Sequence, residues 1–211
     1  MSKTVLVVLL AALAPVRAFA VDGVVLINQS TVMAQGGFPY VISQPGSYKL
    51  SGNLVAPLNS TAIVVSASNV TLDLNGFSVQ CSSNGSGAFL ECVTSFALPF
   101  HDIVVRNGSV SASVVGSPSH GYVLSGIIFS APAQSITLED LQVRVIADNN
   151  DAGFTALAGP YAIIKGNIFT SNRTGLDFNC PSVVVNNVNN TGGIYNLSGS
   201  GCTVSANVGI N

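Results

Sequence analysis

A short strand pattern that ends in Asn or Asp recurs along the chain, and it constrains the fold more than any other feature. Residues 70–76 read VTLDLNG, and related runs follow as IVVRNGSV, ITLEDLQV, AIIKGNIF, VVVNNVNN and TVSANVGI. The residues that close these runs are Asn75, Asn107, Asp140, Asn167, Asn187 and Asn207, so successive intervals are 32, 33, 27, 20 and 20 residues. Short strands repeated at about 20 residues are typical of stacked repeats, because one unit cannot bury its apolar face alone.

The recurrence predicts an all-β fold, a right-handed parallel β-helix (a solenoid) of about six to seven coils. The handedness follows from the usual sense of crossover connections between parallel strands. We expect an N-terminal cap and first strands in residues 21–60, coils in residues 61–211, and a loop excursion at residues 80–100. An inward Asn at each corner would bond to its equivalent in the next coil and form an amide ladder, which Asp140 interrupts. A β-sandwich of antiparallel strands is the alternative.

The first 20 residues have the features of a secretory signal peptide. Lys3 precedes an apolar stretch, and Ala18-Phe19-Ala20 is a small-x-small cleavage signature. The apolar stretch is shorter than the ~20 residues that a membrane-spanning helix needs, and no later segment is apolar enough to span a bilayer. We therefore expect a secreted protein, extracellular or periplasmic, with cleavage after Ala20.

The charge balance and the composition exclude several classes of function. The chain has seven Lys and Arg and nine Asp and Glu, and loss of Lys3 and Arg17 with the signal peptide leaves five against nine. A net charge near −4 provides no basic surface for phosphates, so nucleic acid is not an expected partner. Asn, Ser, Thr, Gly and Val are abundant and rank low in helix propensity, which favours strands.

Several segments resemble secreted bacterial right-handed parallel β-helix repeat proteins of pectin-lyase-like fold. They are VDGVVLINQ, GFPYVISQPGSYKLSGNL, AIVVSASNVTLDLNGFSV and SGSGCTVSANVGIN, which together represent nearly the whole chain after the signal. The resemblance implies the fold rather than an activity, since short members of this kind mostly have no assigned activity. Enzymes on this fold work in a groove beside one sheet and use Ca²⁺-binding carboxylates with a basic residue, or paired Asp.

The four cysteines are Cys81, Cys92, Cys180 and Cys202, and a secreted chain permits disulfides. Three pairings exist. We favour Cys81–Cys92 and Cys180–Cys202, because the first closes a short loop and the second spans about one coil. A metal site is the alternative, but the CxxC spacing of zinc sites is absent and we expect no metal there.

The densest group of carboxylates is the candidate ligand or cation site. Asp148 and Asp151 flank two Asn residues, and Asp177 follows about one coil later. Calcium prefers six or more oxygen ligands, so Ca²⁺ is the one cofactor that this group would suit. A solvated turn is the alternative, since Asp and Asn favour turns. Neither Ser119-His120-Gly121 nor His101-Asp102 comes with an identifiable catalytic partner. Arg106 and Glu139 are expected to pair on adjacent coils.

Two classes of function remain. The first is a non-enzymatic secreted β-helix that binds a polymer, with polysaccharide (carbohydrate) as the expected partner, or that serves a structural role. The second is a polysaccharide lyase, hydrolase or epimerase that acts on an acidic glycan, assisted by Ca²⁺. Paired carboxylates at a catalytic spacing are not identifiable, and the acidic chain is poorly suited to a polyuronate, so we favour the first. The sequence does not decide the catalytic residues or the oligomeric state.

Overall fold

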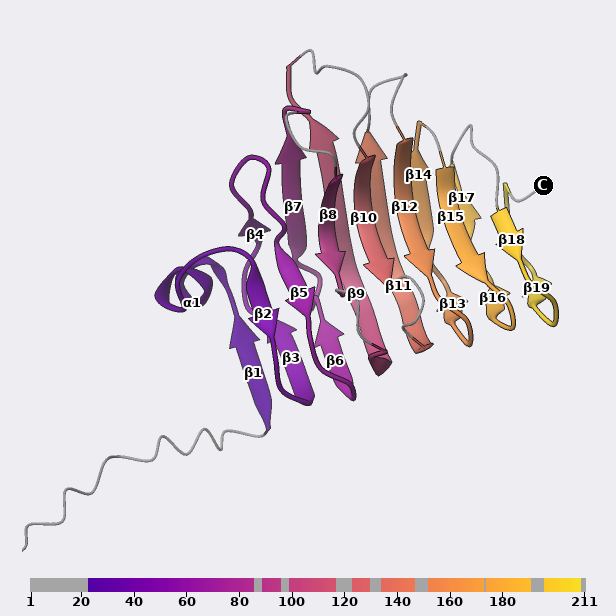
Figure 1. The fold of residues 1–211 in the computed structure, drawn as a ribbon, viewed down its shortest axis with the longest axis horizontal. Helices are drawn as coiled ribbons and strands as arrows, with labels where there is room; N and C mark the ends of the chain where they lie inside the picture. Colours follow the sequence, from indigo (N-terminus) through magenta and orange to yellow (C-terminus); the bar gives the residue numbers. More distant parts are fainter. Residues whose placement is uncertain are drawn as a thin grey trace, which may run out of the picture.

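The protein is an assembly of parallel strands in two sheets (Figure 1). The computed structural model describes residues 23–85, 89–95, 99–116, 123–129, 134–146, 152–172, 174–190 and 196–209. Every strand pairing within these ranges is parallel. The all-β, parallel prediction is confirmed, and the antiparallel alternative is wrong.

The first sheet is built along one path of neighbouring strands: β1 (Val24–Ile27), β3 (Gly46–Leu50), β6 (Val70–Asp73), β9 (His101–Val114), β11 (Gln134–Ile146), β13 (Ile163–Lys165), β16 (Val183–Val185) and β19 (Thr203–Ser205). Four further strands extend it beyond a corner: β4 (Leu54–Val55), β7 (Ser78–Ser83), β14 (Ile168–Ser171) and β17 (Val188–Asn189). β9 and β11 are long enough to pass through the corner and belong to both parts.

The second sheet has the order β18-β15-β12-β10-β8-β5-β2. Its strands are β2 (Tyr40–Ile42), β5 (Ile63–Val65), β8 (Phe89–Thr94), β10 (Val123–Phe129), β12 (Ala152–Ala158), β15 (Thr174–Asn179) and β18 (Asn196–Ser198). The chain alternates between the two sheets, so that consecutive strands of each sheet come from successive stretches of sequence. β7 and β8 occupy residues 78–83 and 89–94, so residues 80–83 and 89–94 of the predicted loop excursion at 80–100 are strands of the two sheets.

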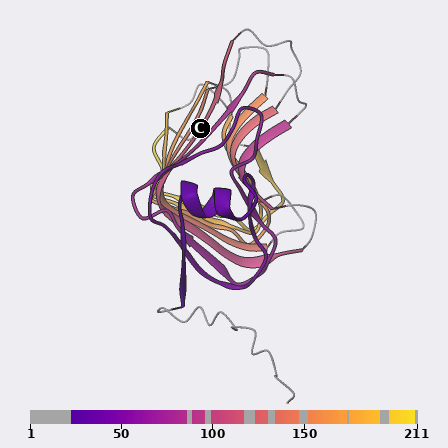
Figure 2. The ribbon, with the colours of Figure 1, turned by 90° about the vertical axis from the view of Figure 1, so that its left-hand side faces the viewer.

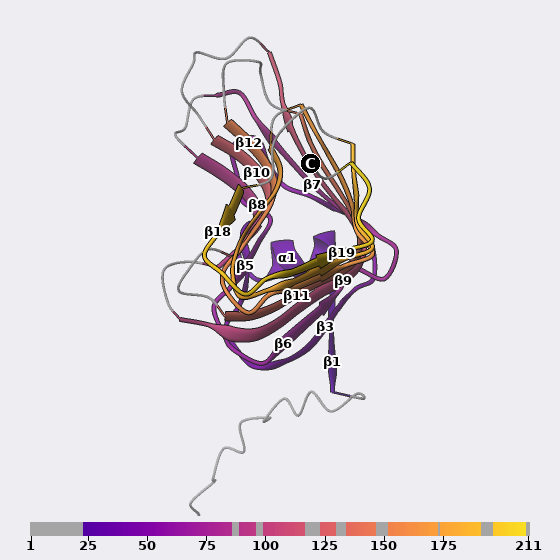
Figure 3. The same ribbon diagram turned by 90° about the vertical axis from the view of Figure 1, so that its right-hand side faces the viewer.

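The core lies between the sheets and follows from the two-residue period of the strands. In β6, Val70 and Leu72 are buried while Thr71 and Asp73 are partly exposed. The neighbouring strands bury an apolar residue at the equivalent position, since Leu72 pairs with Val105, which pairs with Leu138. Seen along the long axis, the strands lie over one another around this interior (Figures 2 and 3). Apolar residues on the inner faces of successive strands, from Ile27 to Val184, therefore merge into one continuous core.

Three of the six residues predicted to form an amide ladder do so. Asn167, Asn187 and Asn207 form an amide ladder: the Nδ2 of Asn167 donates to Oδ1 of Asn187, and the Nδ2 of Asn187 donates to Oδ1 of Asn207, both at 2.9 Å. Each Asn oxygen also accepts the backbone N–H of the preceding member, at 3.0 and 2.8 Å. Asn167 and Asn187 are completely buried. The ladder thus satisfies the backbone of three successive corners.

Asn75, Asn107 and Asp140 do not belong to that ladder, and this part of the prediction is wrong. All three are exposed and have positive φ, at 52°, 60° and 52°. Pairing of Glu139 with Lys165 aligns Asp140 with Gly166, one position before Asn167. Asn and Asp tolerate left-handed backbone better than other non-glycine residues, so they are favoured at this bend as well as at the ladder. A strand that ends in Asn therefore does not reveal which of two adjacent corner positions the Asn fills.

The ladder position is filled differently in the earlier corners. Leu141 stands there in β11, and its backbone N–H donates to Oδ1 of Asn167 at 3.0 Å. Gly108, which pairs with Leu141, stands there in β9. A Cβ on Gly108 would clash with Leu74 and lie 2.7 Å from the carbonyl oxygen of Phe77. The tight approach of the neighbouring turn thus leaves no room for an Asn side chain at Gly108.

A short helix, α1 (Gln29–Ala34), was not predicted from the sequence. Asn28 and Thr31 form a capping box, in which Asn28 Oδ1 accepts from the Thr31 backbone at 3.0 Å and Thr31 Oγ1 accepts from the Asn28 backbone at 2.9 Å. Val32 is completely buried. Figures 2 and 3 show α1 across the interior at the β1 end of the molecule. Through Val32 the helix contributes to the hydrophobic core at this end of the molecule.

The two disulfides join the pairs that we favoured. Cys81 of β7 is bonded to Cys92 of β8, which links the two sheets through the core. Cys180 is bonded to Cys202, 22 residues later. The two bridges therefore join segments that are 11 and 22 residues apart in the sequence. Within the described ranges, no helix combines the length and the apolar character needed to cross a lipid bilayer.

We expect Asn187→Ala to lower the free energy of unfolding by about 3 kcal/mol, since it leaves the Asn167 N–H and the Ile164 carbonyl without partners in a dry interior. Urea unfolding followed by circular dichroism measures the change. The exposed Asn190, three residues later, provides the matched control, and Asn190→Ala should change stability by no more than about 0.5 kcal/mol. Equal effects of the two substitutions would contradict the role given to the ladder.

Candidate functional site

The outer face of the first sheet carries columns of side chains in strict register. One column consists of seven β-branched residues and one Ser: Val24, Ser47, Thr71, Val104, Thr137, Ile163, Val183 and Thr203. These side chains are partly or fully exposed, in contrast to the buried column beside them. Branched side chains suit the flat pleated surface, because their χ1 angles are restricted and adjacent strands hold them in place.

The next outward column is a charge ladder, formed by Lys49, Asp73, Arg106, Glu139 and Lys165, which follow one another on adjacent strands with alternating sign. Arg106 Nε lies 3.5 Å from Asp73 Oδ2, and Arg106 Nη1 lies 3.7 Å from Glu139 Oε1. Lys165 Nζ lies 2.9 Å from Glu139 Oε2. The predicted Arg106–Glu139 pair is therefore present and belongs to a longer series. Arg106 and Glu139 each precede a recurrent corner residue by one position, whereas Asp73 and Lys165 precede theirs by two, so the sequence pattern revealed only the central pair.

Glu139 is the central acceptor of the charge ladder. Its side chain is 16% exposed, whereas those of Arg106 and Lys165 are 44% and 50% exposed. The hydrogen bond and the charge of Glu139 raise the pKa of Lys165 above its usual value of 10.5. The carboxylates of Asp73 and Glu139 are thus engaged with cations of neighbouring strands, and the ladder presents a nearly neutral stripe to solvent.

A shallow groove of about 340 Å³ lies beside the charge ladder. We call it the outer groove; it is lined by Asp102, Val104, Ser135, Thr137, Tyr161 and Ile163. β9, β11 and the turn into β13 supply these residues, two from each level of the sheet. Asp102, Ser135 and Tyr161 form the column at the start of the strands, and all three have left-handed backbone, with φ of 56°, 55° and 63°. Sequence reasoning did not identify this groove.

Asp102 is also bonded to the adjacent His101. His101 Nδ1 lies 2.7 Å from Asp102 Oδ2, and both side chains are more than half exposed. An exposed pair of this kind contributes little to stability. The pair fixes the carboxylate of Asp102 at one end of the outer groove.

The three candidate carboxylates are not brought together by the described part of the structure. Asp148 and Asp151 lie outside the described residues. Asp177 stands in β15, where it pairs with Leu157 and Asn196 on the adjacent strands. Burial raises the pKa of Asp177, and a hydrogen bond from the Phe178 backbone opposes this effect. Among the residues that the structure describes, no three His, Cys, Asp or Glu side chains converge as a metal site would require.

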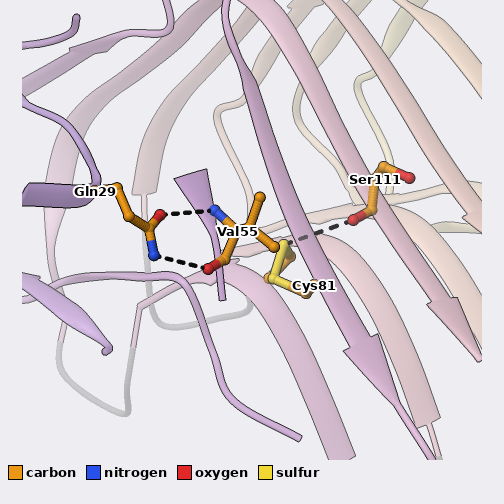
Figure 4. Close-up of a disulfide and its surroundings, with 5 residues drawn as sticks. Gln29, Val55, Cys81 and Ser111 are labelled. Atoms are coloured by element: carbon orange, nitrogen blue, oxygen red, sulfur yellow. Dashed lines mark hydrogen bonds between the residues drawn. A yellow bond between two sulfur atoms is a disulfide. The ribbon is translucent and has the colours of Figure 1, made fainter. Parts of the chain in front are cut away.

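A second, smaller cavity adjoins the Cys81–Cys92 disulfide. It has a volume of about 120 Å³ and lies among β4, β7 and β9, where Ser82, Ser111 and Ser113 contribute hydroxyl groups. Gln29 spans from α1 to β4, and its amide bonds to both the N–H and the carbonyl of Val55 at 3.1 Å (Figure 4). Ser111 approaches the disulfide through its carbonyl, 3.9 Å from Cys92 Sγ. The Gln29 amide therefore satisfies the backbone N–H and carbonyl of Val55 at the exposed edge of β4.

Comparison of the chain with protein-family models, with curated proteins and with solved structures finds no match.

We expect Asp177→Asn to stabilise the protein at neutral pH. Because burial raises the folded-state pKa of Asp177, the contribution of this group is most favourable below the unfolded-state value of about 3.8 and is lost as pH rises through the folded-state pKa. The difference in melting temperature between variant and wild type should therefore grow from pH 3 to pH 7. A difference that is constant with pH would contradict this reading.

We expect Glu139→Gln to destabilise the protein in a way that depends on pH and salt. Since the folded-state pKa of Lys165 is raised, the stabilisation by this pair is complete below the unfolded-state value of 10.5 and is lost as pH rises through the folded-state pKa. Urea unfolding of both proteins at pH 7, 9 and 11 measures the difference. The buried Tyr40 and Tyr48 also titrate at high pH, but they are common to both proteins and cancel. The difference should shrink between pH 9 and pH 11 without vanishing, because Arg106 stays charged and still faces Glu139. A difference that is independent of both salt and pH would contradict the role of the ladder.

Proposed function

We propose that the protein is a secreted right-handed parallel β-helix that binds a polysaccharide and does not alter it chemically. The alternation of the chain between two parallel sheets supports the winding, since each passage through the first sheet, of one or two strands, is followed by one strand of the second sheet before the chain returns. The right-handed sense follows from the general rule for crossovers between parallel strands. The two disulfides suit an oxidising compartment.

The observation that carries the proposal is the regular outer face of the first sheet. Its β-branched column and its charge ladder repeat at the strand spacing of about 4.8 Å along the axis. A polymer laid across the strands would meet small branched side chains at each step of the β-branched column and charges of alternating sign along the charge ladder. Because the side chains are held by neighbours on both sides, little conformational entropy is lost when a ligand binds.

Binding without chemistry agrees with the state of the carboxylates on this face. Asp73 lies 3.5 Å from Arg106, Glu139 lies 2.9 Å from Lys165 and 3.7 Å from Arg106, and Asp102 is bonded to His101. A general acid or base needs a carboxyl group within reach of its substrate and a pKa near the working pH. The carboxylates of the outer face are instead paired with neighbouring basic side chains.

One observation favours the second candidate, a polysaccharide hydrolase or lyase. Asp177 is partly buried and has a raised pKa, which is the direction required of a general acid. It stands on the second sheet, away from the columns described above. A catalytic role would make Asp177→Asn inactive, in addition to its effect on stability.

Affinity electrophoresis and a reducing-sugar assay together test the proposal. The mature protein is run through gels that contain neutral glucans, xylan, mannan, pectate or alginate, with and without Ca²⁺, and each polymer is afterwards assayed for cleavage. We expect retarded migration in at least one polymer with no new reducing ends or unsaturated products. Cleavage that is lost in Asp177→Asn would establish the enzymatic alternative, and unretarded migration in every gel would refute polymer binding.

A further inference from the structure

The outer groove has the composition of a sugar-binding site. Val104 and Ile163 provide an apolar floor, Ser135 and Thr137 provide hydroxyl groups, and Asp102 provides a carboxylate. Tyr161 adds an aromatic ring that is 57% exposed. Pyranose rings have apolar faces and hydroxyl rims, so they suit a surface that combines an exposed ring with a few polar groups.

The groove runs across the strands and not along them. Asp102, Ser135 and Tyr161 occupy equivalent positions on three successive levels, as do Val104, Thr137 and Ile163. The three levels span about 10 Å at a strand spacing of ~4.8 Å. An elongated ligand aligned with the axis of the molecule would therefore contact all six lining residues, whereas a small compact ligand would contact only some of them.

The backbone at the edge of the groove is held in an uncommon conformation. Asp102, Ser135 and Tyr161 have φ between 55° and 63°, a region that costs a non-glycine residue roughly 1 kcal/mol or more. A bulky aromatic residue is unusual there. Tyr161 is fixed by a backbone hydrogen bond to the Pro181 carbonyl at 2.6 Å. The backbone that carries the ring is thus fixed by the turn at the end of the groove.

The charges around the groove select the class of sugar. The charge ladder lies immediately beside the β-branched column of the groove, and its basic residues Arg106 and Lys165 are shared with Asp73 and Glu139. Asp102 adds a negative charge at the opposite side. None of the six described lining residues is Lys, Arg or His. A polyuronate would meet repulsion from Asp102 without a compensating free cation, whereas an uncharged glycan would not.

We propose that the outer groove binds a neutral polysaccharide chain that lies across β9, β11 and β13, with one sugar ring stacked on Tyr161 and with its hydroxyl groups bonded to Asp102, Ser135 and Thr137. The proposal rests on the polymer-binding function proposed above and assigns it a place and a ligand class. Stacking supplies affinity, and the carboxylate and hydroxyl groups set the orientation of the chain.

Isothermal titration calorimetry with cellohexaose, xylohexaose, mannohexaose and hexagalacturonate tests this assignment on the mature protein. We expect the wild type to bind at least one neutral hexasaccharide more tightly than hexagalacturonate. Tyr161→Asn should weaken that binding by about tenfold or more. Asn tolerates the left-handed backbone at this position better than other side chains, so the fold should be kept, and circular dichroism with thermal unfolding verifies this.

Three further variants locate the effect. Tyr161→Phe keeps the ring and should retain most of the affinity. Thr137→Val removes one hydroxyl from the groove without a change of shape and should weaken binding a few-fold. Gln142→Ala is the matched control, since Gln142 is exposed on the same strand but beyond the corner, and it should leave affinity unchanged.

The outcomes separate the two proposals. Binding that survives Tyr161→Asn in a folded protein, or that prefers hexagalacturonate, would overturn the assignment of the groove and leave polymer binding elsewhere on the protein intact. Absence of binding to all four hexasaccharides, together with unretarded migration in every polysaccharide gel, would overturn both.

Discussion

Parallel backbone pairing in constant register is the constraint on which the rest of this structure depends. Each strand of the first sheet places its residues directly over their equivalents in the next, as the pairs Val70–Ile103–Ile136 and Asp73–Arg106–Glu139 illustrate. The side chain at one position of a strand therefore lies next to the side chains at the equivalent positions of the two neighbouring strands. Apolar side chains merge into one core, and any polar or charged side chain must be matched on adjacent strands or remain exposed.

The amide ladder and the charge ladder satisfy that constraint in different ways. Amides carry both a donor and an acceptor, so identical Asn residues can stack in the buried corner and satisfy one another. Like charges cannot stack in this way, and the outward column alternates in sign from Lys49 to Lys165. Burial separates the two cases: Asn187 is completely buried, whereas the Arg106 side chain is 44% exposed. The buried ladder supports the fold, and the exposed one mainly sets the charge of the surface.

The sequence predicted the parallel β architecture and the disulfide pairs because both depend on spacing, which a recurrent pattern displays directly. It failed where two physical causes favour the same residue. Asn75 and Asn107 are bend residues and Asn187 is a ladder residue, yet all three follow a Val/Ile strand. α1 was missed because its low helix propensity is overcome by a capping box and by burial of Val32.

The outer groove was missed because its residues come from levels with unequal intervening loops, so Asp102, Ser135 and Tyr161 show no common period. Asp148 and Asp151, the strongest candidates by composition, lie outside the described residues.

The 20-residue spacing of the amide ladder implies that the molecule could be lengthened by duplication of a segment. A second copy of residues 168–187, inserted after Asn187, would present an Asn to Asn207 on one side and to the original Asn187 on the other, as the present neighbours do. The insert would bring its own interior residues, Phe169, Leu176, Phe178 and Val184. A residue added within a strand would turn the side chains beyond it to the opposite face, whereas the unequal intervals of 32, 33, 27, 20 and 20 residues show that the connections between strands vary in length. The outer face could therefore be lengthened by such a segment while the local chemistry of each level stays the same.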